Sequence, residues 1–425
     1  MKRIHIFAVF IMSFAFFVLP GRCQEESHSN EMQKYRREPA GDNMPHDQEL
    51  ESLPPSENRF SLKPYFETGQ ASGSTTGRAF QVWNPDISII GDFLCHASSD
   101  EKTFDEEFLL REVEIGFSAY VDPYARADIF IGIGKEIFEH AHDAEPDAEG
   151  EEEEVHDHYH VDVEEAYFTF LTLPFNLQAK VGKFRIHFGY VNTRHLHSLD
   201  WVEYPLFMKN YFGEEGFASE GLSVSLVISI PWVHYMELDY EIFNNDQEML
   251  FAGEHADRFA HLIHLKNYWD ISENSSLEVG LSGMMAPTDE DGKRDTALKG
   301  MDIAFKWRPL RMGLYRSFLW QAEILSCRKE TGPAVEDSWG GFMAWNYQFA
   351  RRWSAGLRLD SSSFPDQSDI REKEYSAYLT FAQSEYCFWR AGYASVRSDI
   401  EKNDGERQLF LQLNVGIGPH RAHEY

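Results

Sequence analysis

The sequence has few cysteines and, after its first residues, no long apolar run. Four of the 425 residues are cysteine, and Cys23 falls in the leading segment. The other three, Cys95, Cys327 and Cys387, are odd in number and widely spaced, which excludes a disulfide framework. No stretch after the leader has the roughly 18 uninterrupted apolar residues of a transmembrane helix. The mature chain is therefore either soluble or crosses a membrane as strands.

Positive charge is also scarce. The chain has 39 Lys and Arg against 70 Asp and Glu, a formal net charge of -31. Such a balance disfavours nucleic acid and other anionic partners and favours cations. The sequence lacks GxSxG, HExxH and a phosphate-binding glycine loop, so we expect no enzyme. The alternative is a hydrolase that uses carboxylates and histidines outside these motifs.

The first 23 residues, MKRIHIFAVFIMSFAFFVLPGRC, are typical of a secretory signal peptide. Lys2 and Arg3 precede an apolar run from Ile6 to Leu19, and we expect cleavage before Gln24. An uncleaved anchor is the alternative, although the run is shorter than the ~20 residues of a spanning helix. Residues 24–83 are polar and show little periodicity, which predicts a flexible segment.

From residue 84 to 425 the chain alternates apolar and polar residues. In the segment that begins LLREVEIGF, for example, Leu109, Val113 and Ile115 share one face and Glu112 and Glu114 the other. A period of two indicates strands with one apolar face.

The alternation predicts sixteen strands near the following residues: 86–96, 107–121, 124–136, 161–172, 177–189, 217–229, 233–244, 257–268, 274–286, 297–308, 316–328, 338–349, 353–362, 373–383, 386–397 and 406–417. Short connections, such as Asp122-Pro123 and Asn267 to Asn274, alternate with long ones. The long ones are 97–106, 137–160, 190–216, 245–256, 287–296, 329–337, 363–372 and 398–405. This pattern predicts an all-β fold, a transmembrane antiparallel up-and-down β-barrel of about 16 strands with short periplasmic turns and long outer loops. A large secreted β protein is the alternative.

Four segments carry a resemblance to a known family: NPDISIIGDF (84–93), LREVEIGFSAYVDPYARADIFIGIG (110–134), VEEAYFTFLTLPFNLQAKVGKFRIHFGYVNTRHLHSLDWVEYP (163–205) and GIGPHRAHEY (416–425). They resemble porin-like outer-membrane proteins sometimes labelled zinc-regulated TonB-dependent outer membrane receptors. The resemblance implies an outer-membrane barrel with a link to zinc. Energy-coupled receptors fill barrels of about 22 strands with a globular plug. Fewer than 65 residues separate the signal from the first strand, too few for that plug.

The polar faces of the strands would line a water-filled lumen. The candidate pore-lining residues are Glu112, Glu114, Arg126, Asp128, Lys183, Arg185, Glu237, Asp239, Glu241 and Arg358. Facing rows of opposite charge could filter solutes through a transverse field, or simply be wetted residues paired to one another. The alternation changes phase at Gly182, which predicts a β-bulge there.

The long connection 190–216 is the candidate constriction. His195 and His197 would lie on the same side of an extended chain and could ligate a metal with Asp200 or Glu203. The alternative is that these side chains hydrogen-bond the loop to the barrel wall.

The stretch HAHDAEPDAEGEEEEVHDHYH, 140–160, contains five histidines: His140, His142, His156, His158 and His160. Imidazoles with carboxylates suit Zn(II) or another divalent cation. This stretch falls in an outer connection, which predicts weak metal capture at the mouth. The alternative is a solvated acidic loop bridged to lipopolysaccharide through divalent ions.

These features predict a porin-like channel, exported to the outer membrane of a Gram-negative bacterium, that passes small hydrophilic solutes by passive diffusion with a preference for cations. It would need no cofactor, would contact lipid and lipopolysaccharide but no nucleic acid, and could form a homotrimer. The alternatives are a TonB-coupled metal receptor component, a channel for small anions or sugars, and a structural or adhesive surface barrel.

Overall fold

The structure is a computed structural model. It describes residues 85–99, 108–135, 159–245, 247, 249–251, 258–289, 293–332, 334–399 and 405–418. The predicted signal peptide 1–23 and flexible segment 24–83 lie outside these residues. Within the described part, no helix combines the length and apolar character needed to cross a membrane.

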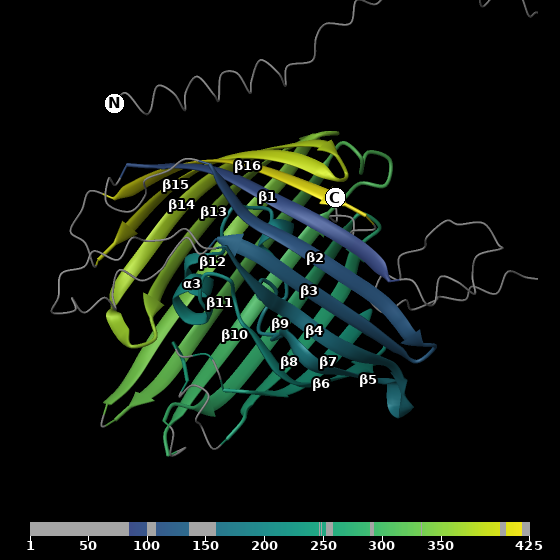
Figure 1. Cartoon of the computed structure of the whole chain (residues 1–425), viewed down its shortest axis with the longest axis vertical. Helices are drawn as coiled ribbons and strands as arrows, with labels where there is room; N and C mark the ends of the chain where they lie inside the picture. Colours follow the sequence, from purple (N-terminus) through teal and green to yellow (C-terminus); the bar gives the residue numbers. More distant parts are fainter. Residues whose placement is uncertain are drawn as a thin grey trace, which may run out of the picture. The chain divides into compact units, whose positions relative to one another are not determined.

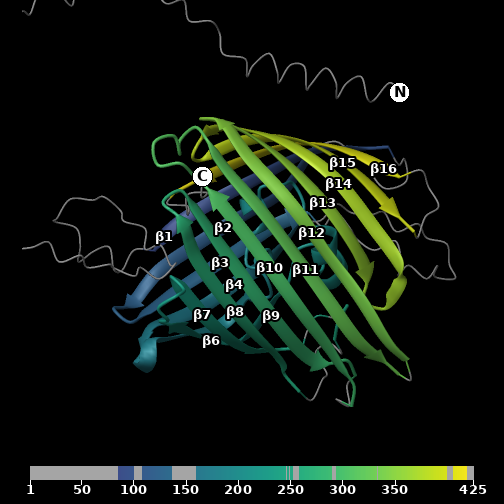
Figure 2. The same cartoon turned by 180° about the vertical axis from the view of Figure 1, so that it is seen from behind.

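Sixteen antiparallel strands form one closed barrel in which β1 pairs with β16, and Figures 1 and 2 show its two sides. The strands are β1 (Asp86–Ser98), β2 (Leu109–Asp122), β3 (Ala125–Lys135), β4 (Tyr159–Leu173), β5 (Leu177–Arg185), β6 (Ala218–Ile228), β7 (Tyr235–Phe243), β8 (Ala260–Ser272), β9 (Ser275–Pro287), β10 (Asp295–Trp307), β11 (Ser317–Thr331), β12 (Ala334–Ala350), β13 (Trp353–Phe364), β14 (Gln367–Ser384), β15 (Cys387–Ser398) and β16 (Glu406–Ile417). Closure leaves no strand edge unpaired, so every strand has two hydrogen-bonded neighbours. The predicted fold class is confirmed.

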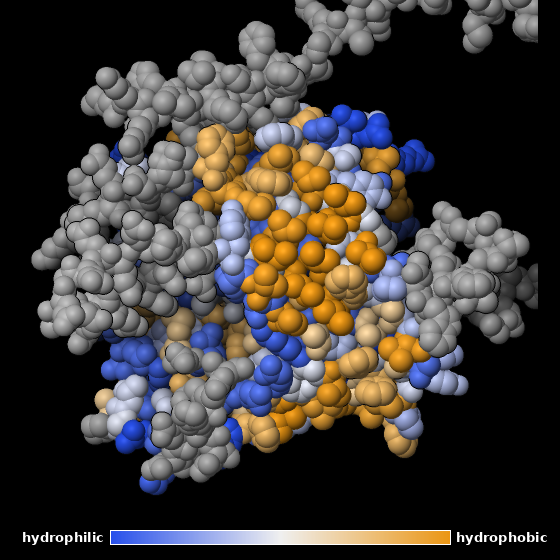
Figure 3. Space-filling view, viewed as in Figure 1, coloured by the Kyte–Doolittle hydropathy of each residue, from blue (hydrophilic) through white to orange (hydrophobic). Residues whose placement is uncertain are grey.

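The outer face of the barrel is apolar. Figure 3 shows apolar side chains gathered over β1 to β3, with hydrophilic residues toward the ends of the barrel. Around the wall, the exposed apolar side chains include Ile129, Phe168, Leu222, Ile263, Leu281, Met301, Ile324, Met343, Leu357 and Leu379. Such a band suits a hydrocarbon environment and would be costly in water.

Two predicted long connections, 329–337 and 363–372, are wrong. β11 continues to Thr331 and β12 begins at Ala334, while two residues join β13 to β14. The polar residues in the first of these segments belong to the ladder, where Arg328 lies opposite Asp337 and Lys329 opposite Glu336. Opposite charges across a pair of strands stabilise it, so these strands extend although their composition resembles a loop.

Two boundaries and a predicted bulge also differ from the prediction. The connection expected from Asn267 to Asn274 is only two residues long, because β8 continues through Ser272. β5 ends at Arg185 rather than at 189, because the chain there turns into the barrel. Neither ladder of β5 shifts register at Gly182, so the predicted bulge is wrong. Gly182 instead has φ 134°, and a Cβ there would lie 2.2 Å from the Ala166 carbonyl oxygen.

The barrel encloses a hydrophobic core built from the segment between β5 and β6 and from inward wall residues. This segment, residues 186–217, is called the inner loop below. It contains the helices η2 (Leu196–Ser198) and α3 (Leu206–Phe212), whereas η1 (Pro174–Asn176) lies between β4 and β5. The fully or nearly fully buried members include Phe188, Tyr204, Phe207, Tyr211, Phe212 and Phe217 of the inner loop and Phe243, Leu262, Met284, Leu298, Leu325 and Phe342 of the wall. Each large apolar side chain so buried contributes about 1.5–3 kcal/mol.

Candidate functional site

The inner loop folds back into the barrel and is closed at its base. Asn192, with 0% exposure, donates its side-chain amide to the carbonyls of Ile186 (2.6 Å) and Phe217 (2.9 Å). Its Oδ1 accepts the Phe217 N–H at 2.8 Å, and the Ile186 N–H donates to the Phe217 carbonyl at 3.1 Å. The two ends of the loop are therefore fixed side by side, and α3 packs against β12 and β13. Figure 1 shows α3 within the ring of strands.

Carboxylates of the wall accept backbone N–H groups from Arg185 onward. A buried N–H without a partner costs free energy, and the loop has little regular structure in which to pair its own. The pairs are Glu165 with the N–H of Arg185 (3.1 Å), Glu241 with His187 (3.0 Å), Glu323 with Val191 (3.2 Å) and Asp360 with Leu206 (3.3 Å). The wall thus replaces the secondary structure that the loop lacks.

Three wall arginines hold successive backbone carbonyls of the same loop. They are Arg390, which donates to the Trp201 carbonyl (2.8 Å), Arg111, which donates to Val202 (2.6 Å), and Arg358, which donates to Glu203 (2.6 Å). Arg358 has 0% exposure and also pairs with Asp360 and Glu374 at 2.8 Å each. These three guanidinium groups are therefore engaged with the loop.

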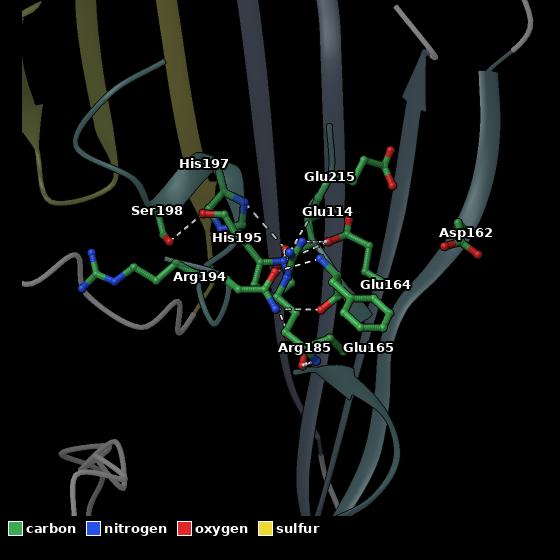
Figure 4. Close-up of polar contacts among 12 residues, drawn as sticks. Glu114, Asp162, Glu164, Glu165, Arg185, Arg194, His195, His197, Ser198 and Glu215 are labelled. Carbon is green, nitrogen blue, oxygen red and sulfur yellow. Dashed lines mark hydrogen bonds and ion pairs between the residues drawn. The ribbon is translucent and has the colours of Figure 1, made fainter. Parts of the chain in front are cut away.

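A second group of side chains joins the other side of the inner loop to the wall. We call it the carboxylate–histidine cluster: His195, His197, Glu112, Glu114, Glu164 and Glu165. His195 Nδ1 lies 2.9 Å from both Glu114 Oε2 and Glu164 Oε2, and its Nε2 lies 2.7 Å from Glu165 Oε1. His197 Nδ1 lies 3.7 Å from Glu114 Oε2. Figure 4 shows His195 projecting from the loop among these carboxylates.

Two irregularities in the ladders bring the carboxylates together. The β3–β4 register shifts between Phe130 and Ile131, which leaves Glu164 as an extra residue on β4. Glu164 and Glu165, adjacent in sequence, therefore both reach His195 inside the barrel. On β3, a Cβ at Gly132 would lie 2.4 Å from Glu164 Oε1, so glycine leaves the room that this carboxylate occupies.

A similar shift places Arg111 as an extra residue on β2. Arg111 thereby reaches the Asp92 carboxylate and the loop carbonyl of Val202 from inside the barrel. The shift also changes the phase of the strand, so Leu109, predicted on the outer apolar face, packs against the inner core.

The cluster is strongly acidic for an enclosed site. Four carboxylates face two imidazoles and the guanidinium of Arg185, whose Nη2 lies 3.6 Å from Glu164 Oε2. Burial alone would lower the pKa of His195, but the charge and hydrogen bonds of Glu114 and Glu164 outweigh it and raise this pKa well above its ordinary value. The carboxylates thus favour the imidazolium form of His195, the form that neutralises part of the cluster.

The structure brings His195 and His197 together as the sequence predicts, but with other partners. Asp200 accepts a hydrogen bond from Asn346 at 2.8 Å, and Glu203 pairs with Lys209 at 2.5 Å. The expected partnership of the histidines with Asp200 or Glu203 is wrong, because these two carboxylates face other elements. The alternative, a hydrogen-bonded attachment to the wall, describes the contacts of His195.

Of the remaining candidate pore-lining residues, Arg126 and Asp128 lie on the inner face. Lys183 is in phase with the exposed Val181 on β5 and lies opposite Glu220, so its predicted position in the lumen is wrong. Arg126 and Asp128 form a salt bridge at 2.6 Å, and Lys183 pairs at 3.1 Å with Asp162, whose side chain is 52% exposed. Asp239 lies 2.9 Å from His187 Nδ1, and His187 stacks on His264 at 4.1 Å.

Among the three acids of β7, Asp239 and Glu241 are buried, whereas Glu237 is half-buried and accepts from Tyr235 at 2.8 Å. The inner surface is thus charged but largely paired, and several of the charges are shielded from solvent.

The histidines His140, His142, His156 and His158 lie outside the described residues. His160, also assigned to that connection, belongs to β4, where it lies opposite Gly134. Metal capture by this stretch therefore stays a prediction from the sequence.

Sequence reasoning missed most of the wall residues that hold the loop. Glu164, Glu165 and Arg111 depend on bulges that no residue pattern marks. Glu323 and Arg390 lie on strands more than 130 residues from their loop partners. The one available signal was charge on an inward strand position, which many lumen residues share.

The closed barrel with an apolar exterior and a loop folded into its interior has the architecture of porin-like outer-membrane barrels. No family model matches the chain. An uncharacterised protein of Aquifex aeolicus (strain VF5) is 26% identical over 304 residues, which is 62% of this chain and 63% of that protein. The matched part thus spans less than two thirds of that relative.

Among solved structures, the outer membrane channel DcaP of Acinetobacter baumannii matches with a TM-score of 0.50 and 8% identity over 79% of this chain and 96% of DcaP. OmpT, an outer membrane protein of Vibrio cholerae, matches with a TM-score of 0.47 and 9% identity over 78% of this chain and 97% of that one. At these identities the likeness concerns the fold. The resemblance to zinc-regulated receptors gains no support from these matches.

Proposed function

We propose that the protein is a passive, porin-like channel of the bacterial outer membrane that passes small hydrophilic solutes and prefers cations. The observation that carries this proposal is the inner loop, held inside a closed barrel by the charged wall. A loop folded into a barrel narrows the lumen, so what passes depends on the residues beside it. Such diffusion needs no catalytic residue and no cofactor.

The cation preference is supported by the distribution of charge around the loop. The arginines Arg111, Arg358 and Arg390 are engaged with loop carbonyls, and the first two also pair with wall acids. The carboxylate–histidine cluster and the acids of β7, by contrast, leave an excess of negative groups. The formal net charge of -31 adds to this bias. Assembly into a homotrimer and capture of cations by residues 140–160 remain predictions from the sequence.

The test of the channel is the reversal potential of the full-length protein in planar bilayers under a potassium chloride gradient. We expect ion conductance and a reversal potential whose sign reports cation preference, weakened at high salt by screening. Anion preference would support a channel for small anions. The complete lack of conductance would contradict the proposal and favour a structural or adhesive barrel.

The finer part of the proposal is that the carboxylate–histidine cluster binds Zn(II) or another divalent transition metal. Two triads, Glu112 with Glu114 and His197, and Glu114 with Glu164 and His195, each place their ligand atoms within 4.8 Å of one another. Imidazole and carboxylate are the donor set that these ions accept. A bound dication would supply positive charge among these carboxylates.

The competing role for His195 is an imidazolium that only fixes the loop to the wall. His195→Lys separates the two roles, because it keeps a cation near Glu114 and Glu165 but removes the imidazole ligand. We expect this variant and Glu114→Gln to bind Zn(II) at least about tenfold more weakly by calorimetry. The matched control is His234→Gln, an imidazole with 61% side-chain exposure that pairs with Asp270. Unchanged zinc affinity in both His195→Lys and Glu114→Gln would leave only the structural role, because Glu114 belongs to both triads.

A further inference from the structure

Three basic side chains lie together on the outward face of β14 and β15, near the ends of the strands that lead to the outer connections. They are Arg371, Lys373 and Arg397. Lys373 and Arg397 are exposed and stand directly opposite each other in the β14–β15 ladder. Like charges opposite each other destabilise a strand pair unless an anion lies between or above them.

A surface hollow of about 490 Å³ lies at these residues. Its lining is mostly charged: Arg371, Lys373 and Arg397 with Asp369, Asp399, Ser368 and Tyr375. Three basic and two acidic groups give it a formal charge of +1, in a chain whose net charge is -31. The backbone N–H of Asp399 donates to the Arg371 carbonyl at 3.1 Å, so the chain after β15 is joined to β14 beside the hollow.

Arg371 is positioned by an aromatic ring. Its guanidinium lies 4.9 Å from the centroid of the Trp339 ring on β12. Among the described residues, its buried Nε has no hydrogen-bond partner. A guanidinium that is oriented by stacking on an aromatic ring is suited to bind an oxyanion through charge-assisted hydrogen bonds.

The outward residues of β14 change character from the rim toward the middle of the wall. Arg371 and Lys373 come first, then Tyr375 with 50% exposure, Ala377 and Leu379 with 39% exposure. On β15, Tyr393 lies opposite Ala377, below Arg397. This order matches the layers of a membrane: the charged side chains correspond to the lipid headgroups, the tyrosines to the interface, and the aliphatic side chains to the hydrocarbon.

We propose that this hollow binds the phosphate groups of a phosphorylated glycolipid of the outer leaflet, with the acyl chains against Tyr375, Tyr393 and Leu379. The proposal rests on the proposed outer-membrane location but is independent of channel activity. Arg and Lys bind phosphate through charge-assisted hydrogen bonds. The apolar wall next to the hollow can contact acyl chains, which a soluble phosphate does not have.

The experiment measures binding of lipid A to the full-length protein in detergent by native mass spectrometry. Three probes separate the sources of phosphate: lipid A with both phosphates, the same lipid after dephosphorylation, and inorganic phosphate. We expect lipid A to bind at least about tenfold more tightly than the dephosphorylated lipid, from one or two lost charge-assisted hydrogen bonds. Inorganic phosphate at equal concentration should not displace it.

The test variant is Lys373→Gln with Arg397→Gln, and a second variant is Arg371→Gln. Both should weaken lipid A binding about tenfold or more while the barrel remains folded, because these side chains lie on the outer face. The matched control is Arg351→Gln with Arg352→Gln, two exposed arginines in the turn between β12 and β13 at the other end of the barrel.

Equal binding of the dephosphorylated lipid, full displacement by inorganic phosphate, or wild-type affinity in the Lys373 and Arg397 variant would each overturn the proposal. A protein that conducts ions but fails to bind lipid A would contradict only this inference. A protein that binds lipid A but does not conduct would contradict only the proposed channel.

Discussion

Asn192 closes the inner loop by bonding twice to one residue, Phe217. Its Oδ1 accepts the Phe217 N–H at 2.8 Å and its Nδ2 donates to the Phe217 carbonyl at 2.9 Å. An asparagine side chain can pair with a peptide unit in this way because its amide carries a donor and an acceptor side by side. This side chain therefore reinforces the backbone hydrogen bond from Ile186 to Phe217 that joins the entrance of the loop to its exit.

Asn192→Ala should destabilise the inner loop by about 1–3 kcal/mol, since it leaves buried polar groups of Ile186 and Phe217 unpaired. We expect earlier unfolding in denaturant and faster cleavage within 186–217 by a protease. The control is Thr193→Ala, an exposed neighbour whose hydroxyl donates only to the Tyr190 carbonyl at 3.0 Å. Equal stability of the two variants would contradict the role of Asn192.

Gly189 is predicted to tolerate no side chain. Its φ is 66°, and a Cβ would lie 1.7 Å from Glu323 Oε1, the carboxylate that accepts the Val191 N–H through Oε2. Gly189→Ala should cost about 1–3 kcal/mol through strain and displacement of Glu323. Gly283→Ala on β9 is the control, because its Cβ would meet Ile263 at an ordinary 3.5 Å. Denaturant midpoints with matching slopes would measure the difference.

Arg358 is the wall residue whose loss should disturb the loop most. Arg358→Met leaves Asp360 and Glu374 without their cation and frees the Glu203 carbonyl, a change expected to cost about 3–5 kcal/mol. If the loop then leaves its position, single-channel conductance rises. Arg351→Met, on an exposed turn, should change neither quantity. Unaltered stability and conductance in Arg358→Met would show that the loop does not depend on this contact.

Acid should weaken the inner loop through Glu203. Burial raises the pKa of Glu203, but Lys209 at 2.5 Å outweighs this and holds the pKa at about 2, below its ordinary 4.5. A carboxyl with a depressed folded-state pKa contributes stability that is present above its unfolded pKa and lost as the pH falls toward the folded value. Stability should therefore fall between pH 4.5 and pH 2. Glu203→Gln should flatten that slope, measured as the denaturant midpoint at several pH values.

The strands could be predicted because alternation is a local property of the sequence. β16 begins and ends at the predicted residues 406 and 417, since Leu409, Leu411, Leu413, Val415 and Ile417 recur at every second position. The ends of β11 and β12 could not be predicted, because charged cross-strand pairs such as Lys329 with Glu336 resemble a loop until their partner is known.

The site was only half predictable for the same reason. The spacing of His195 and His197 indicated that they act together, and the structure confirms that they lie together, with ring centroids 5.5 Å apart. Their partners come from β2 and β4, and Glu164 faces inward only because of a bulge. Which wall carboxylate meets which loop residue depends on barrel closure. The alternation within a single strand does not indicate these long-range contacts.

The wall carboxylates have a consequence for how this protein can change over time. Glu165, Glu241, Glu323 and Asp360 hold main-chain N–H groups, which every residue except proline possesses. At these four positions the wall therefore recognises the path of the main chain rather than the identity of the side chain. Substitutions at the contacted positions can alter the chemistry of the barrel interior while the loop keeps its course, and proline is the one residue that this arrangement forbids.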